Sequence, residues 1–225
     1  MKPYFETELG KLYHGRFEDI LPFMPVFDLV LTDPPYGIGE SGKQNSTRGK
    51  LATSSYFGGI NYDNDKLPDS ILKLMLSHGE NQIVFGGNYY GSVLGDTPCY
   101  LVWDKGNGNT DFADCELAWT SFKTATRIIK YRWHGMLQEN MAHKEKRVYP
   151  GQKPVGLFKW VLDKYASKKD TVCDPCCGSG TTAIACEDRG IRWVAIDKLE
   201  IACEIAAKRI DRETQQLKLF RGQNG

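Results

Sequence analysis

The sequence predicts an α/β domain with a mixed, mostly parallel sheet, helices on both faces of the sheet and an antiparallel edge. Short apolar runs alternate with segments of helical spacing, a pattern typical of parallel sheets whose crossovers are helices. The middle of the chain instead contains consecutive strand-like segments rich in β-branched and aromatic residues, which favours antiparallel pairing there. Because 225 residues fit one domain better than two, we expect a single domain over residues 1–225.

Four elements are expected in the first half of the chain. Residues 26–32 form an apolar run that ends at Asp-Pro-Pro, which is typical of a buried strand stopped by proline. Residues 37–59 are rich in Gly, Ser, Thr and Asn without hydrophobic periodicity, and we expect a long functional loop there. Residues 67–78 have helical apolar spacing, and residues 82–85 form a second apolar strand.

The second half continues the alternation. Strands are expected over residues 100–103, 116–122, 127–133, 171–173 and 193–196. Helices are expected over residues 155–165, 181–188 and 200–210, and Gly190 should end the second of these because glycine readily adopts the left-handed conformation.

Composition narrows the class of protein. No apolar run approaches the roughly 18 residues that span a membrane, and the N-terminal residues contain no apolar signal region. The seven cysteines are an odd number, so we interpret them as reduced thiols of a cytoplasmic protein. The net charge is only +1, but residues 123–153 contain eight Lys or Arg against two Glu. Such a local excess of positive charge is where we would look for a nucleic-acid surface.

The first motif is C-D-P-C-C-G-S-G-T-T, from Cys173 to Thr182, between an expected strand and an expected helix. Gly178 and Gly180 allow a tight turn and close approach to a ligand, and the helix N-terminus offers free N–H groups. Asp197 follows the next strand, where a carboxylate can accept hydrogen bonds from a ribose diol. The spacing also fits a relaxed dinucleotide-binding pattern, whereas the absence of a following Lys argues against a Walker loop. No second Cys or His pair follows the cysteines, so we expect no zinc.

The second motif is D-P-P-Y, Asp33 to Tyr36, directly after the strand at 26–32. The two prolines fix the backbone and remove two N–H donors, which leaves the Asp33 carboxylate and the Pro34 carbonyl as acceptors. Such a corner can accept both hydrogens of a planar amino group while Tyr36 stacks on the attached ring. A simple strand-ending turn would also use Pro and Asp, but the second proline and the tyrosine favour the functional interpretation.

Together, D-P-P-Y and D-P-x-x-G-S-G-T-T resemble the amino-methyltransferases of DNA. The catalytic tetrapeptide precedes the cofactor loop, as in the permuted group called the beta class, and the small adenine-N6 methylases of phages and prophages are most similar. Residues 12–21, the segment Gly151-Gln152-Lys153-Pro154 and residues 83–119 also resemble these enzymes, so the likeness covers nearly the whole chain. It implies a Rossmann-like methyltransferase fold with a small target-recognition region within about residues 105–150.

The resemblance also implies roles for individual residues. Asp33, Pro34, Pro35 and Tyr36 would be catalytic, and the cofactor would be S-adenosylmethionine. The cofactor would be held by Phe17, Asp33, Lys153, Asp174, Pro175, Cys176, Gly178, Ser179, Gly180, Thr181, Thr182 and Asp197. Four positions differ from the usual family pattern: Arg16 replaces a common Asp, Cys176 replaces Phe, Tyr149 replaces His and Gly151 replaces Thr.

The implied macromolecular substrate is double-stranded DNA, with no membrane partner and with a homodimer left open. A base inside a duplex cannot reach the corner, so it must be flipped out. The expected phosphate contacts are Lys123, Arg127, Lys130, Arg132, Lys144, Lys146 and Arg147, with Arg48 and Lys50 on the loop at 37–59.

The expected reaction is methylation of N6 of adenine. Two acceptors would localise the lone pair of a delocalised amine and stabilise the positive charge that develops on it, without a metal or a covalent enzyme intermediate. Three alternatives stay open: N4-cytosine methylation, in which the family commonly has Ser at the position of Asp33; a DNA-binding relative without activity; and a dinucleotide-dependent oxidoreductase, against which D-P-P-Y argues.

Overall fold

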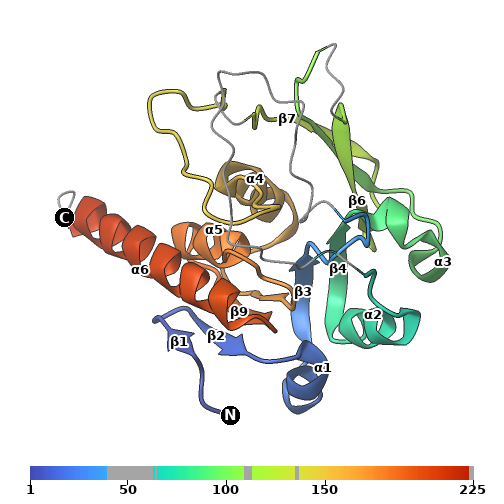
Figure 1. The fold of residues 1–225 in the computed structure, drawn as a ribbon, viewed down its shortest axis with the longest axis horizontal. Helices are drawn as coiled ribbons and strands as arrows, with labels where there is room; N and C mark the ends of the chain where they lie inside the picture. The colour runs from blue at the N-terminus through green and yellow to red at the C-terminus, as the bar shows by residue number, and fades with distance from the viewer. Residues whose placement is uncertain (40–62, 64, 109–112, 135–136, 223–225) are drawn as a thin grey trace.

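A single twisted sheet organises the chain (Figure 1). The computed structural model describes residues 1–39, 63, 65–108, 113–134 and 137–222. In the described residues the strand order is β1-β2-β9-β8-β3-β4-β6-β5-β7. The pairs β2–β9, β9–β8, β8–β3, β3–β4 and β5–β7 are parallel. Antiparallel pairing occurs where β1 joins β2 and where β6 lies between β4 and β5. The expected mixed, mostly parallel sheet is confirmed.

The strands are short, as in most sheets of this kind. Their bounds are β1 Phe5–Glu6, β2 Gly10–His14, β3 Phe27–Thr32, β4 Gly79–Phe85, β5 Tyr100–Asp104, β6 Cys115–Thr120, β7 Arg127–Lys130, β8 Thr171–Asp174 and β9 Arg192–Asp197.

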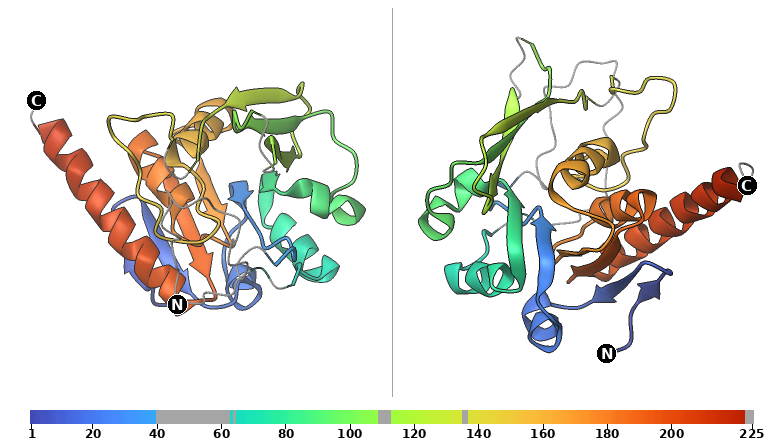
Figure 2. Two further views of the ribbon diagram at one scale, coloured as in Figure 1. Left: turned by 45° about the horizontal axis from the view of Figure 1, so that its top comes forward. Right: turned by 180° about the vertical axis from the view of Figure 1, so that it is seen from behind.

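Helices cover both faces of the sheet, as Figure 2 shows from two directions. One face carries α4 (Val155–Tyr165), α5 (Thr181–Arg189) and α6 (Glu200–Gly222). The other carries α1 (Phe17–Ile20), α2 (Asp69–Leu76) and α3 (Gly91–Leu94), with two short 3-10 turns, η1 (Leu21–Phe23) and η3 (Gly87–Tyr89). None of the helices in the described residues is long and apolar enough to cross a bilayer.

Alternation along the central strands builds two cores. On β3, Leu29 and Leu31 face the core that includes α4 and α5, whereas Val30 faces the core that includes α2. The two cores meet across the buried parallel strands, so removal of a large side chain there would leave a cavity and cost about 2–5 kcal/mol. This packing makes the carboxyl ends of the strands a rigid platform.

Most expected elements are present, with shifted ends. Helix 155–165 has the expected bounds, and Gly190 ends α5 with φ +68°. The expected helix 67–78 begins only at Asp69, because Pro68 has an extended backbone and caps it. The expected strand 127–133 ends at Lys130, and the last helix continues well beyond residue 210.

The carboxyl ends of β3, β8 and β9 lie side by side, because these strands are parallel neighbours. The chain leaves β8 toward β9 on one side and leaves β3 toward β4 on the other. The gap between β8 and β3 is therefore a topological switch point, where open α/β sheets bind their ligands.

Candidate active site

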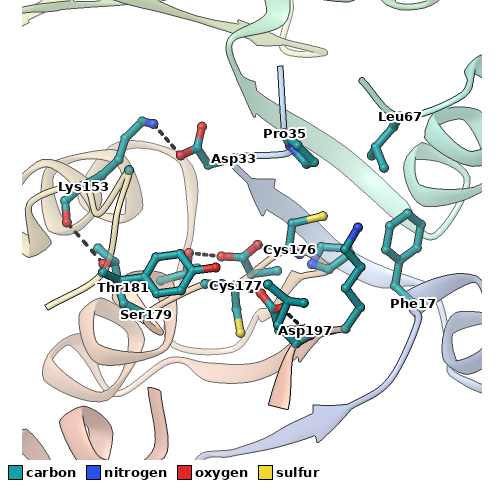
Figure 3. Close-up of a pocket in the computed structure, with 18 of the residues that line it drawn as sticks. Phe17, Asp33, Pro35, Leu67, Lys153, Cys176, Cys177, Ser179, Thr181 and Asp197 are labelled. Atoms are coloured by element: carbon teal, nitrogen blue, oxygen red, sulfur yellow. Dashed lines mark hydrogen bonds and ion pairs between the residues drawn. The ribbon is translucent and has the colours of Figure 1, made fainter. Parts of the chain in front are cut away.

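A cavity of about 250 Å³ opens at this switch point (Figure 3). Its walls combine the loop after β3, the start of α1, the segment before α2, the segment before α4 and the turn between β8 and α5. Of the residues expected to bind a cofactor, it is lined by Phe17, Asp33, Lys153, Asp174, Pro175, Cys176, Gly178, Ser179, Thr181, Thr182 and Asp197. The two sequence motifs thus meet in one cavity, although about 140 residues separate them.

The turn between β8 and α5 is shaped by Asp197 at the end of β9. The Gly178 N–H donates to Asp197 Oδ2 at 2.8 Å, and the Leu199 N–H donates to Oδ1 at 2.9 Å. Burial raises the pKa of Asp197. Each carboxylate oxygen keeps a second lone pair, so Asp197 can still accept hydrogen bonds from a diol in the cavity.

Asp174, at the end of β8, ties the turn to the neighbouring strand. Its carboxylate accepts hydrogen bonds from Thr32 Oγ1 on β3 at 2.9 Å, from Thr182 Oγ1 on α5, and from the Cys176 N–H. Burial raises its pKa to about 7 despite these donors. With three protein donors on it, Asp174 fixes the geometry of the cavity.

Gly180 is the exception among the expected cofactor residues, because it does not line the cavity. Its φ is +77°, and a Cβ at this position would lie 3.0 Å from Ala206 Cβ on α6. Gly180 therefore lets α5 and α6 approach each other. Buried Arg209 of α6 supports the same turn, donating to the Ser179 carbonyl at 2.6 Å and to Ser179 Oγ at 2.7 Å.

The Asp33 carboxylate stands on the opposite wall at the end of β3. It accepts hydrogen bonds from the Lys153 ammonium and from the Tyr36 hydroxyl, one on each oxygen. Burial raises the pKa of Asp33, while Lys153 opposes that rise. Each oxygen retains a lone pair, so the carboxylate can accept one more hydrogen bond from a ligand.

Lys153 lines the cavity and also contacts two side chains of the D-P-P-Y segment, Asp33 and Tyr36. Its ammonium lies 3.2 Å from Glu116 Oε2 and 3.3 Å from the Tyr36 hydroxyl, in addition to its bond with Asp33. Burial alone would lower the pKa of Lys153, but the Asp33 and Glu116 carboxylates raise it well above its usual range. Lys153 is therefore charged, and its backbone carbonyl also accepts a hydrogen bond from Thr181 at 3.2 Å.

Tyr36 lies beside the cavity and does not line it. Its ring stacks on Tyr89, with centroids 4.9 Å apart and planes at 15°. Gly86, with φ +65°, makes room for it, since a Cβ there would lie 2.0 Å from Tyr36 Cε1. Pro35 is held by Tyr90, whose buried hydroxyl donates to the Pro35 carbonyl.

The four residues that depart from the family pattern all line the cavity. Arg16 forms an exposed ion pair with Glu18, and both residues line the cavity. Cys176 lines the cavity, and the buried Tyr149 ring would lie 3.2 Å from a Cβ at Gly178.

The described basic residues that we expect to contact DNA are all exposed. They are Lys123, Arg127, Lys130, Arg132, Lys144, Lys146 and Arg147, and none of them lines the cavity. Arg147 lies over the Trp133 ring, at 5.9 Å from its centroid. Arg48 and Lys50 lie outside the described residues.

Two carboxylates of the site belong to neither sequence motif. Buried Asp63 accepts hydrogen bonds from the N–H groups of Tyr36 and Gly37, at 2.6 and 2.9 Å. Glu116 reaches Lys153 from β6. Both are single carboxylates outside any motif, and only the folded chain brings them to the corner.

Comparison with known proteins agrees with this geometry. Residues 87–208, more than half of the chain, match the family described as DNA methylase (N6_N4_Mtase). The chain is 24% identical to the type II methyltransferase M.ScaI of Streptomyces caespitosus, over 96% of this chain and 86% of that protein. It is 22% identical to M2.MboI of Moraxella bovis, over 97% and 94% of the two chains.

Solved methyltransferases share the fold. The M1.HpyAVI–SAM complex superposes with a TM-score of 0.58 at 19% identity, covering 89% of this chain and all of that one. The PvuII DNA methyltransferase, which is cytosine-N4-specific, superposes with a TM-score of 0.57 at 15% identity, covering 96% and 94%. The chain belongs to the DNA methylase family and is an S-adenosylmethionine-dependent DNA methyltransferase.

Proposed function

We propose that this protein methylates N6 of adenine in double-stranded DNA and that Asp33 is its catalytic carboxylate. One observation carries the proposal: Asp33 lies at the carboxyl end of β3 and opens into the same cavity as the β8–α5 turn and Asp197. An acceptor for an amino group and a nucleoside site are thus parts of one cavity.

The residues of the cavity fit S-adenosylmethionine. Asp197 offers acceptors for a ribose diol, and Phe17, Leu67 and Ile71 offer apolar surface for a purine ring. The N-terminus of α5 faces the cavity through Thr181 and Thr182 and suits a carboxylate. The bound cofactor supplies a methyl group on a positively charged sulfur, which leaves as a neutral thioether.

Asp33 would accept a hydrogen bond from the target amino group, with the Pro34 carbonyl as the second acceptor. Two acceptors draw the amine toward tetrahedral geometry and stabilise its growing positive charge. Tyr36 and Lys153 already hold the carboxylate in place, so little reorganisation is needed when the base arrives.

Asp33 itself favours adenine over cytosine, because the N4-cytosine members commonly have Ser at this position. The fold does not discriminate, since the similar PvuII enzyme is cytosine-N4-specific. N4-cytosine methylation therefore remains the second candidate. The order of the motifs, D-P-P-Y before the cofactor loop, supports assignment to the beta class, and the target base would have to leave the duplex.

The test is to express the protein beside a plasmid in a methylation-deficient host and to read modified bases by position. We expect N6-methyladenine at one short sequence. N4-methylcytosine would correct the base, and an unmodified plasmid with folded, cofactor-binding protein would overturn the proposed activity.

A further inference from the structure

We propose that Glu116 is a positioning residue for methyl transfer: it holds Lys153 between two carboxylates and so keeps Asp33 a strong hydrogen-bond acceptor. The inference rests on the proposed function, because it takes Asp33 as the group that contacts the target amine. Glu116 belongs to neither sequence motif and sits on β6, across β4 from the strand that carries Asp33.

Four charged groups form a row at the corner. Lys105 Nζ lies 2.6 Å from Glu116 Oε1, and Glu116 Oε2 lies 3.2 Å from Lys153 Nζ. Lys153 then binds Asp33. Positive and negative groups alternate along this row, and its two cations balance its two carboxylates.

The Oε2 atom of Glu116 is the unusual member of the row. It is fully enclosed, and within the described part of the chain it accepts no well-formed hydrogen bond. Burying a carboxylate oxygen in this way costs free energy unless a charge offsets it. The charge that faces Oε2 is Lys153, so the contact acts on the lysine that binds Asp33.

The consequence for Asp33 follows from sharing one cation. Lys153 contacts both Asp33 and Glu116. A lysine shared by two carboxylates lowers the basicity of each one less than a lysine paired with that carboxylate alone. Without Glu116, Asp33 would be the one carboxylate that binds Lys153 among the described residues, and its carboxylate would become a weaker acceptor. The Lys153 ammonium, which already binds one oxygen of Asp33, would also be free to direct its other N–H groups at the lone pairs that the target amine needs.

Other charged and titratable groups around the corner set the background. Tyr36, Asp174, Cys176 and Tyr90 face Asp33, and Lys105, Lys153 and Tyr36 face Glu116. The negative charge of Glu116 raises the pKa of Asp33, whereas Lys153 lowers it. Removal of Glu116 should therefore make Asp33 ionise at lower pH.

The experiment compares single-turnover methyl-transfer rates against pH, at saturating cofactor and DNA. For Glu116→Gln we expect a methyl-transfer rate about tenfold lower at neutral pH. We also expect the acidic limb of its pH–rate profile to lie at a pH lower by roughly 0.5. Glu116→Asp, which keeps the charge, should leave the limb in place and recover part of the rate. Glu204→Gln removes a carboxylate from the exposed ion pair with Lys208 and should change nothing.

A purely structural role for Glu116 would give a different result. Glu116→Gln would then lower thermal stability without moving the acidic limb, and this outcome overturns the proposal. Asp33→Ala measured in parallel separates the two claims. If Asp33→Ala keeps turnover, the proposed function of Asp33 is wrong. If Asp33→Ala abolishes turnover while the acidic limb of the pH–rate profile of Glu116→Gln stays in place, only the proposed role of Glu116 is wrong.

Discussion

Single carboxylates and their donors determine what this site can do. Asp33, Asp174 and Asp197 lie at the carboxyl ends of three adjacent parallel strands, yet their surroundings give them different tasks. Asp174 is surrounded by protein donors, Asp197 shapes the turn and keeps capacity toward the cavity, and Asp33 is held by a lysine and a tyrosine. Sequence spacing predicts where these acids lie, but only their donors distinguish the carboxylates that order the turn from the one that we propose to be catalytic.

Tyr36 allows its hydroxyl and its ring to be tested separately. Tyr36→Phe removes the hydrogen bond to Asp33 but keeps the ring. We expect the activation free energy of methyl transfer to rise by about 1–2 kcal/mol, which lowers the rate roughly tenfold, with little change in KM for DNA. Tyr36→Ala also removes stacking and should weaken binding of DNA by a further 1–3 kcal/mol or so. Steady-state kinetics with DNA as the varied substrate measures both effects. Equal values for the two variants would exclude a role for the ring.

Asp174 predicts a pH dependence of stability. Its pKa of about 7 in the folded protein exceeds the ordinary value of 3.8, so the folded state binds the proton more tightly than the unfolded state. The free energy of unfolding should therefore fall as pH rises from about 4 to 7, by up to about 1.4 kcal/mol per pH unit from this group. In Asp174→Asn, urea unfolding should lose this part of the slope. An unchanged slope would show that Asp174 is ionised throughout.

At the scale of elements, the sequence predicts the helices and strands that have a periodic apolar pattern. It does not predict those whose position depends on pairing with a distant strand. Strand β2 is short and is placed by parallel pairing with β9, a contact that no local pattern reveals. The strand at Arg127 ends at Lys130, although Tyr131 and Trp133 suggest continuation. Helix α6 extends to Gly222 through charged residues that favour helix but lack an apolar stripe.

The α5–α6 contact tests the reassignment of Gly180. Gly180→Ala places a Cβ at 3.0 Å from Ala206 in a left-handed conformation, and we expect a loss of about 1–3 kcal/mol in the free energy of unfolding. Gly190→Ala is the matched control, because Gly190 has φ +68° but open space around its Cβ position. Chemical denaturation of both variants isolates the packing contribution. If Gly180→Ala instead weakened only cofactor binding, the packing role would be wrong.

The segment before α4 combines an anchored side and an exposed side. Glu145 faces inward, accepting hydrogen bonds from Arg209 at 2.6 Å and from the Val155 N–H at 2.9 Å. Its neighbours Lys144, Lys146 and Arg147 are exposed. The alternation orients the basic residues outward on a fixed segment.

Neutralising Lys144, Lys146 and Arg147 together should weaken DNA binding and flatten its salt dependence. The slope of log K against log salt should fall by about one for each phosphate contact removed, with cofactor affinity unchanged. Lys168 and Lys169, exposed just before the amino end of β8, provide the control substitution to Gln. Wild-type affinity and slope in the triple variant would exclude this cluster from the DNA surface.

At the scale of the whole molecule, two motifs that are far apart in the sequence lie next to each other in the sheet. Strand β3, which the D-P-P-Y segment follows, precedes β8 and its Gly-rich turn in the sequence, and the parallel pairing of β3 with β8 brings the two segments together. The fold class and both motifs are predictable because each depends on local sequence. The contacts of Asp63, Glu116, Tyr89 and Tyr90 are not predictable from the sequence, because they depend on long-range pairing. The resemblance over residues 83–119 covers the last three but gives no role to any of them.

The most direct test of the account measures cofactor affinity and methyl transfer in the same two variants. Asp33→Ala should lose methyl transfer to DNA while its dissociation constant for S-adenosylmethionine, measured by calorimetry, stays within about threefold of wild type, because the remaining donors and acceptors of the cavity are intact. Asp197→Ala should instead weaken cofactor binding by about 1–3 kcal/mol. Near-normal turnover by Asp33→Ala on DNA would contradict the central claim that this carboxylate carries the reaction.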